Sequence, residues 1–206
     1  SMMHSLQMQT LFAPATIRMT WRSVLPQKLH RFCENECVTE DGQLKHKATG
    51  KTVKAIVVVH VFGNMADMEA IMDIAQEFHL KVIEDATEAL GTQYTKGRYA
   101  GKFAGTIGDF GAYSFNGNKI ITTGGGGAVT AKDPAEVEHL KYLSTQAKDD
   151  PHFYIHNEVG YNYRMSNVIA GVVRGQFPYL EEHIAQKKAI YERYKDGLKE
   201  LPVHMN

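Results

Sequence analysis

Residues 54–88 carry the pattern that most limits what this chain can fold into. Ala55–Val59 is a continuous apolar run rich in β-branched residues, which is typical of a parallel strand buried on both faces. A helical pattern follows, and Lys81–Glu84 forms a second short strand pattern. The apolar residues of the helix recur at i, i+3, i+4 and i+7, namely Met68, Ile71, Met72, Ala75 and Phe78. The order predicts a right-handed βαβ unit whose polar loops lie at the carboxyl ends of its strands.

Acidic residues come directly after the second of these strands, in the sequence Asp85-Ala86-Thr87-Glu88. Proteins with α/β sheets bind ligands at this edge. Asp85 has a simpler use, because a carboxylate can cap the turn that follows it. The position alone leaves both interpretations open.

A second unusual stretch, GDFGAYSFNGNKIITTGGGG, runs from Gly108 to Gly127. A strand-like segment leads into the polar turn Asn116–Asn118, and then come Lys119, β-branched residues and four glycines. The simplest interpretation of Lys119 is a solvated loop lysine. The alternative is an amine that forms a Schiff base with a cofactor aldehyde, in a loop whose glycines let the backbone approach a ligand closely.

A nucleotide-binding P-loop is excluded for this stretch. Asn118 separates Gly117 from Lys119, and Ile120 stands where the Mg²⁺-binding hydroxyl is required.

Pyridoxal phosphate (PLP) chemistry accounts for the parts in their order along the chain. It needs a lysine to hold the cofactor, a carboxylate that keeps the pyridine nitrogen protonated, and hydroxyl or N–H groups for the phosphate. Lys119, Asp85 and Ser114 fit these three requirements.

The remaining segments are less informative. Residues 1–23 show no sustained period, a helix is expected from Pro26, and residues 39–52 form a loop or a short hairpin. Pro134 starts another predicted helix, and residues 147–166 form a loop in which polar and aromatic side chains crowd together, as in a binding site. A helical region runs from Asn167 to about Leu201, and Pro178 is expected to kink or divide it.

Charge and cysteine content limit the class of protein. The 23 basic and 23 acidic residues cancel, so no electrostatic footprint points to nucleic acid or to a membrane surface. No apolar run reaches membrane-spanning length, and no signal-peptide pattern is seen. Cys33 and Cys37 lie four residues apart with no histidine at ligand spacing, so no metal site is predicted and reduced thiols are expected. These observations favour a cytoplasmic protein.

The chain resembles the DegT/DnrJ/EryC1/StrS family of PLP-dependent sugar aminotransferases, and within it the LegC-like branch. The resemblance rests on KAIVVVHVFGNMADM, VIEDATEALGT, GKFAGTIGDFGAYSFNGNKIITTGGGG and VGYNYRMSNVIAG, which together cover residues 54 to about 201. It implies that Lys119 holds PLP and moves the proton. Cofactor roles would also fall to Asp85 at the pyridine nitrogen, Thr87 at the ring, Glu88 near the 3-oxygen and Ser114 at the phosphate. Asn162 would reach the cofactor phosphate of a neighbouring subunit, which implies a homodimer, and His60 and Arg164 would either orient the substrate or serve the structure.

The resemblance implies a fold and a reaction. The fold is α/β, part of the large domain of a fold type I PLP-transferase, with a mostly parallel sheet and flanking helices. Residues 1–23 are undetermined, 24–180 form the central part of that domain, and 181–206 form a long helix leading to an absent small C-terminal domain. Family dehydrases carry histidine in place of the lysine, so Lys119 implies an aminotransferase. Its substrates would be a 4-keto nucleotide-linked hexose and an amino-acid donor, usually glutamate.

The sequence also departs from the family. Relatives are about twice as long and carry an upstream phosphate-binding turn and a ring-stacking aromatic residue, neither of which is recognisable here. A chain truncated at both ends is therefore expected. Two functions stay open, namely a sugar-nucleotide aminotransferase and a non-catalytic remnant that serves as a binding or assembly module.

Overall fold

The computed structural model describes residues 16–19, 26–150, 152–203 and 205. These residues form two compact units. The first unit holds the described residues up to Tyr113 together with Ala128–Arg164, and the second holds Ser114–Gly127 and the described residues from Met165 onward. The division of the chain expected at residues 24–180 and 181–206 stays a prediction.

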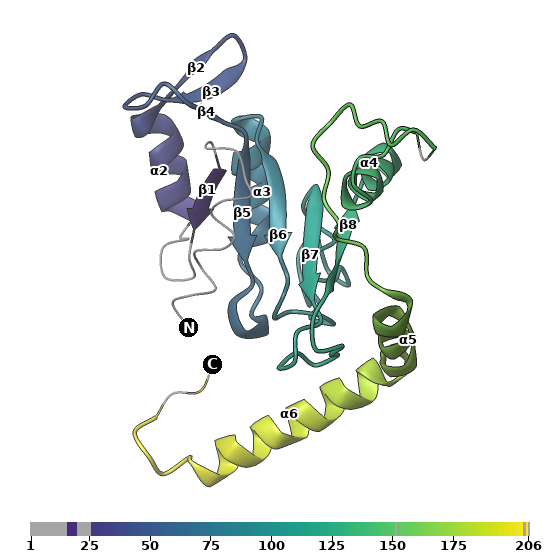
Figure 1. Cartoon of the computed structure of the whole chain (residues 1–206). Coiled ribbons are helices and arrows are strands. Elements are labelled where there is room, and N and C mark those ends of the chain that lie inside the picture. The colour runs from purple at the N-terminus through teal and green to yellow at the C-terminus, as the bar shows by residue number, and fades with distance from the viewer. Residues whose placement is uncertain (1–15, 20–25, 151, 204, 206) are drawn as a thin grey trace. The chain divides into compact units, whose positions relative to one another are not determined.

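A five-stranded sheet with the order β1-β5-β6-β7-β8 organises the first unit (Figure 1). Its strands are β1 (Thr16–Met19), β5 (Ala55–Val59), β6 (Lys81–Asp85), β7 (Phe110–Ser114) and β8 (Gly127–Ala131). The first four run parallel to one another. The N–H of Lys132, just after β8, donates to the carbonyl of Asp109, just before β7, at 3.1 Å, so β8 runs antiparallel to β7. The mostly parallel α/β fold predicted from the sequence is confirmed.

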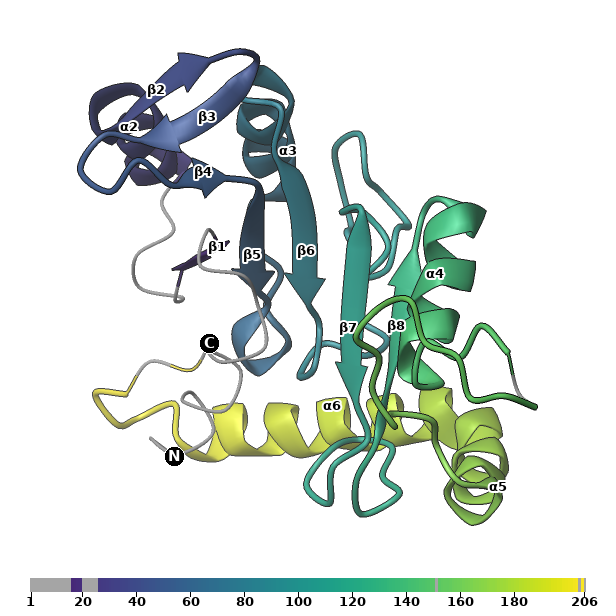
Figure 2. The ribbon, with the colours of Figure 1, turned by 45° about the horizontal axis from the view of Figure 1, so that its top comes forward.

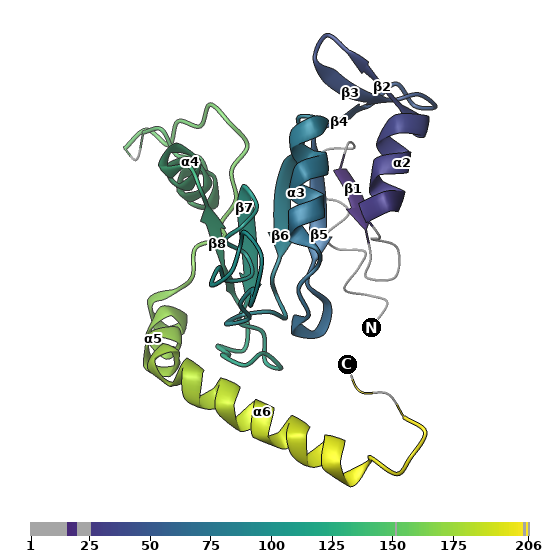
Figure 3. The ribbon, with the colours of Figure 1, turned by 180° about the vertical axis from the view of Figure 1, so that it is seen from behind.

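Helix α3 (Met68–Glu77) connects β5 to β6 and confirms the predicted βαβ unit. Its first turn is capped by Asp67, whose side chain accepts a hydrogen bond from the N–H of Ala70. Figure 3 shows α3 in front of β5 and β6 when the sheet is seen from behind. The buried face of the helix and the strands share one apolar core, which includes Met68, Ile71, Ile74, Ala75, Ile56, Val58 and Val82.

Helix α2 (Pro26–Glu36) starts at a proline, as predicted, and buries Leu29 and Cys33. A small antiparallel sheet follows (Figure 2), formed by β2 (Cys37–Glu40), β3 (Gln43–His46) and β4 (Thr52–Val53). Asp41 and Gly42 connect β2 to β3 with φ angles of 51° and 74°, the pair of positive values that a tight two-residue hairpin turn requires. Of the two alternatives for residues 39–52, the hairpin is therefore the one observed.

The short 3₁₀ helix η1 (Val61–Gly63) follows β5, and α4 (Pro134–Ser144) follows β8. The predicted loop at residues 147–166 has no helix or named strand in its described part, only isolated bridges such as Thr145 with Asn162.

In the second unit, α5 (Asn167–Gln176) and α6 (Leu180–Gly197) are separated by the 3₁₀ turn η2 (Phe177–Tyr179). Of the two alternatives expected at Pro178, a kink or a division, the division is the one observed. No helix in the described part of the chain is long and apolar enough to cross a bilayer.

For residues 1–23, the structure describes only β1, which the sequence did not reveal. The rest of that segment lies outside the described residues.

Candidate active site

Asp85 is the last residue of β6 and pairs with Val59 of β5 and Ala112 of β7. It is only 8% exposed, and its Oδ1 accepts a hydrogen bond of 3.2 Å from the N–H of Thr87. The Asp85 carboxylate thus caps the turn that follows β6, as one of the two interpretations expected. A carboxylate has two oxygens with several acceptor positions, so this one bond does not use up its capacity for a ligand.

Glu88 holds the loop that follows β5. Its Oε2 accepts a hydrogen bond of 2.7 Å from the N–H of Phe62. Phe62 has a φ of 55° and is 76% exposed, an uncommon combination for a bulky residue. Glu88 therefore contributes to a left-handed backbone conformation beside the end of β5.

His60 is fully buried, and both of its ring nitrogens have partners. Its Nε2 lies 2.8 Å from Oε2 of Glu84, and its Nδ1 accepts a hydrogen bond of 3.2 Å from the N–H of Ala66. These contacts support the structural alternative that the sequence left open for His60. Arg164, the other residue with two interpretations, is exposed.

Asn162 is exposed and forms an isolated antiparallel bridge with Thr145. Within the first unit, the structure thus gathers His60, Asp85, Thr87 and Glu88 at the ends of β5 and β6, and it places Asn162 and Arg164 on the long loop.

In the second unit, Ser114 Oγ accepts a hydrogen bond of 3.2 Å from the N–H of Asn116. The N–H of Lys119 donates to the carbonyl of Asn116 at 3.0 Å and closes the predicted polar turn. Lys119 itself is half-buried.

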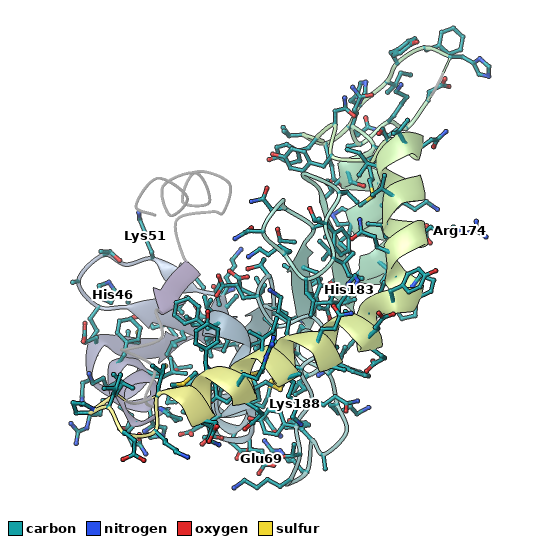
Figure 4. The ribbon with its side chains drawn as sticks, turned by 90° about the horizontal axis from the view of Figure 1, so that it is seen from below. His46, Lys51, Glu69, Arg174, His183 and Lys188 are labelled. Atoms are coloured by element: carbon teal, nitrogen blue, oxygen red, sulfur yellow. The ribbon has the colours of Figure 1, made fainter. Side chains whose placement is uncertain are left out.

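Two residues that the sequence did not indicate hold the loop around Lys119. The side-chain amide of Gln176, at the end of α5, bonds both backbone groups of Thr122, at 3.1 and 2.6 Å. His183 lies on α6 (Figure 4), and its Nδ1 is 3.2 Å from the carbonyl of Ile120. Each contact spans more than fifty residues, so neither has a local sequence signal.

The residues present can be compared with what PLP needs. Asp85 supplies a largely buried carboxylate at the end of a parallel strand. Ser114 Oγ already accepts one hydrogen bond, which leaves its O–H hydrogen available for a phosphate oxygen. Among the described residues, no group of three His, Cys, Asp or Glu side chains could hold a metal ion.

The mostly parallel α/β fold and the buried carboxylate at the end of β6 are features that a PLP-dependent aminotransferase requires. It belongs to the DegT/DnrJ/EryC1/StrS aminotransferase family, whose family model matches residues 33–206.

Two curated proteins and one solved structure illustrate the relationship. The chain is 43% identical over 155 residues to a putative pyridoxal phosphate-dependent aminotransferase, EpsN, from Bacillus subtilis, covering 75% of this chain and 39% of EpsN. It is 39% identical to GDP-perosamine synthase from Escherichia coli O157:H7, covering 78% of this chain and 42% of that protein. A DegT/DnrJ/EryC1/StrS aminotransferase from Brucella abortus superposes with a TM-score of 0.68 at 28% identity, covering 75% of this chain and 40% of that one. The chain thus spans about two fifths of the length of the relatives that it matches.

Proposed function

We propose that this chain carries PLP on Lys119 and takes part in the transamination of a 4-keto nucleotide-linked hexose, with glutamate as the amino donor. When bound, PLP supplies an aldehyde that carries the amino group and a pyridine ring that accepts electrons.

The environment of Asp85 is the observation that carries the proposal. A nearly buried carboxylate is stabilised by hydrogen bonds or by a charged partner, and the bond from the N–H of Thr87 leaves acceptor positions on Asp85 for a ligand. The proposed partner is the protonated pyridine nitrogen of PLP, which Asp85 would hold in its charged form.

The other side chains have distinct tasks in this proposal. Thr87 lies against the ring while its N–H fixes the Asp85 carboxylate. Glu88, which already holds the N–H of Phe62, lies near the ring's 3-oxygen. Ser114 donates its hydroxyl hydrogen to the phosphate.

Lys119 has two tasks, first to hold the cofactor and then to carry a proton on Nζ. A lysine acts as a base only when its amine is neutral. The turn that Asn116 closes, together with the contacts of Gln176 and His183, fixes the backbone on both sides of this lysine.

Substrate and assembly complete the proposal. The relatives include GDP-perosamine synthase, which supports a nucleotide-linked sugar as substrate. The keto group at C4, the LegC-like branch and glutamate as donor rest on the sequence resemblance. We also place Asn162 at the cofactor phosphate of a second subunit, so the functional unit is a homodimer, and we place the reaction in the cytoplasm. His60 and Arg164 stay candidates for substrate orientation, although the contacts of His60 favour a structural role.

The alternative function is a non-catalytic module that keeps the lysine loop for binding or assembly. Absorbance spectra separate the two functions. An aminotransferase gains a visible band with PLP and loses it when glutamate is added, and a 4-keto nucleotide sugar then restores it while a 3-keto isomer does not. A spectrum equal to that of free PLP, unchanged by glutamate, would contradict the proposal and favour the module.

A further inference from the structure

Glu84 is a fully buried carboxylate one residue before Asp85 on β6. Its Oε1 accepts hydrogen bonds from the N–H groups of Ile107 and Gly108, at 2.6 and 2.5 Å. Its Oε2 accepts from the N–H of Gly105 at 2.9 Å and faces Nε2 of His60 at 2.8 Å. All four groups around this carboxylate are donors.

The hydrogen bonds determine the direction of the contact between these two side chains. Because Nδ1 of His60 accepts from the N–H of Ala66, its Nε2 carries the hydrogen that points at Glu84. Burial alone raises the pKa of the Glu84 carboxyl. The hydrogen bonds from His60, Gly108 and Gly105 outweigh burial and lower the pKa, so Glu84 is a carboxylate at neutral pH.

The backbone around Glu84 is shaped to bring the donors in. Gly105 has a φ of 82°, and a Cβ on Gly108 would lie 2.8 Å from the carbonyl oxygen of Val82. Only glycine suits either position. The loop at residues 105–108 therefore closes against β6 through the Glu84 carboxylate.

The same contacts reach Asp85. The backbone N–H of His60 donates to the carbonyl of Asp85 at 3.0 Å, while its ring bonds the side chain of Glu84. Neighbouring residues of a strand point to opposite faces, so Glu84 fixes β6 from one face while the Asp85 carboxylate points to the other.

We propose that Glu84 is a positioning residue for PLP, which sets the orientation of the Asp85 carboxylate through the His60 and Gly105–Gly108 contacts. This inference rests on the proposed function, because it assigns Asp85 to the cofactor. Glu84 touches no cofactor atom in this account and acts only through its neighbour.

Glu84→Gln is the sharpest change, because it keeps the side-chain shape and replaces one acceptor oxygen by an NH₂ group that faces donors. The exposed Glu138, which pairs with Lys141 on the surface of α4, offers Glu138→Gln as a matched control. PLP dissociation constants are measured by absorbance titration for the unchanged chain, for E84Q, for D85A and for the double variant. Exchange of the Thr87 amide, whose N–H donates to Asp85, is followed by NMR without cofactor.

We expect E84Q to weaken PLP binding about tenfold when Asp85 is present and to have almost no effect in the D85A background. The Thr87 amide should exchange faster in E84Q and not in E138Q. An equal loss of affinity in both backgrounds would show a general structural role and overturn the inference, as would an unchanged Thr87 amide.

If the unchanged chain does not bind PLP, the proposed function fails, and the Thr87 amide still tests whether Glu84 controls Asp85. If E84Q does not fold, His60→Leu removes one donor from the same carboxylate and should give a smaller loss with the same dependence on Asp85.

Discussion

The side-chain amide of Gln176 bonds both the N–H and the carbonyl of Thr122, at 3.1 and 2.6 Å. One side chain at the end of α5 thus fixes the backbone of Thr122, three residues beyond Lys119. The backbone that carries the proposed cofactor lysine is held by a helix that begins almost fifty residues later in the chain.

Replacing Gln176 by alanine should lower the free energy of unfolding by about 1–3 kcal/mol, because two partly buried backbone groups lose their partners. It should also reduce PLP incorporation at Lys119. Urea unfolding and mass spectrometry after borohydride reduction measure the two effects. Gln186→Ala serves as the control, since the side chain of Gln186 bonds the exposed side chain of Glu182 and no backbone group of the described residues. Equal losses in both variants would contradict the role of the Thr122 contact.

Replacing Phe62 by asparagine should stabilise the folded chain. Its φ of 55° costs a bulky residue about 1–2 kcal/mol, which asparagine partly avoids, and its 76% exposure leaves little packing to lose. Phe62→Asn should therefore raise the melting temperature. Phe153 is 79% exposed and does not have a positive φ. Phe153→Asn is therefore the control and should change the melting temperature little. A fall in stability for Phe62→Asn would show that the ring makes a contact that this account omits.

Gly108→Ala should destabilise the chain by about 1–3 kcal/mol. The new Cβ would lie 2.8 Å from the carbonyl oxygen of Val82 and 3.3 Å from Cγ of Glu84, and backbone atoms of a central strand cannot move aside easily. Gly125 has no atom within 4 Å of a Cβ, so Gly125→Ala is the matched control in thermal unfolding. Two equal melting temperatures would argue against close contact between the Gly105–Gly108 loop and β6.

The buried thiol of Cys33 should make the folded chain less stable at alkaline pH. Burial, followed by the nearby Cys37 and Glu77, raises the pKa of its thiol from 9.0 to about 12. Between these two values the unfolded chain loses a proton that the folded chain keeps, so the free energy of unfolding falls as pH rises above 9. Cys33→Ala should lower the free energy of unfolding at pH 8, because packing is lost. Between pH 8 and 10.5, however, the free energy of unfolding of the variant should fall less steeply than that of the unchanged chain. Parallel urea midpoints for both chains over this range would contradict the shifted pKa.

The sequence predicted those parts of the fold that have a local signal. The β-branched run predicted the bounds of β5, and the helical period located α3. Pro26 marked the start of α2, and Pro178 marked the break between α5 and α6. β1 escaped prediction because a four-residue strand has too few positions to show a period.

Parts of the candidate site also have a local sequence signal. Asp85 and the turn at Asn116–Lys119 follow from residues near each other in the chain. The hydrogen bonds of Glu84 do not, because their donors come from His60 and from glycines more than twenty residues away. An acidic residue inside a strand gives no sign of which backbone groups will meet it.

Trapping of PLP on Lys119 tests the central claim most directly. The chain is incubated with excess PLP, reduced with borohydride, digested and mapped by mass spectrometry beside Lys119→Ala. We predict one dominant pyridoxyl group, on the peptide that contains Lys119, and its loss in the variant while the variant stays folded. The claim would be contradicted if Lys119 carried no pyridoxyl group, or if pyridoxyl groups were spread equally over surface lysines in both chains.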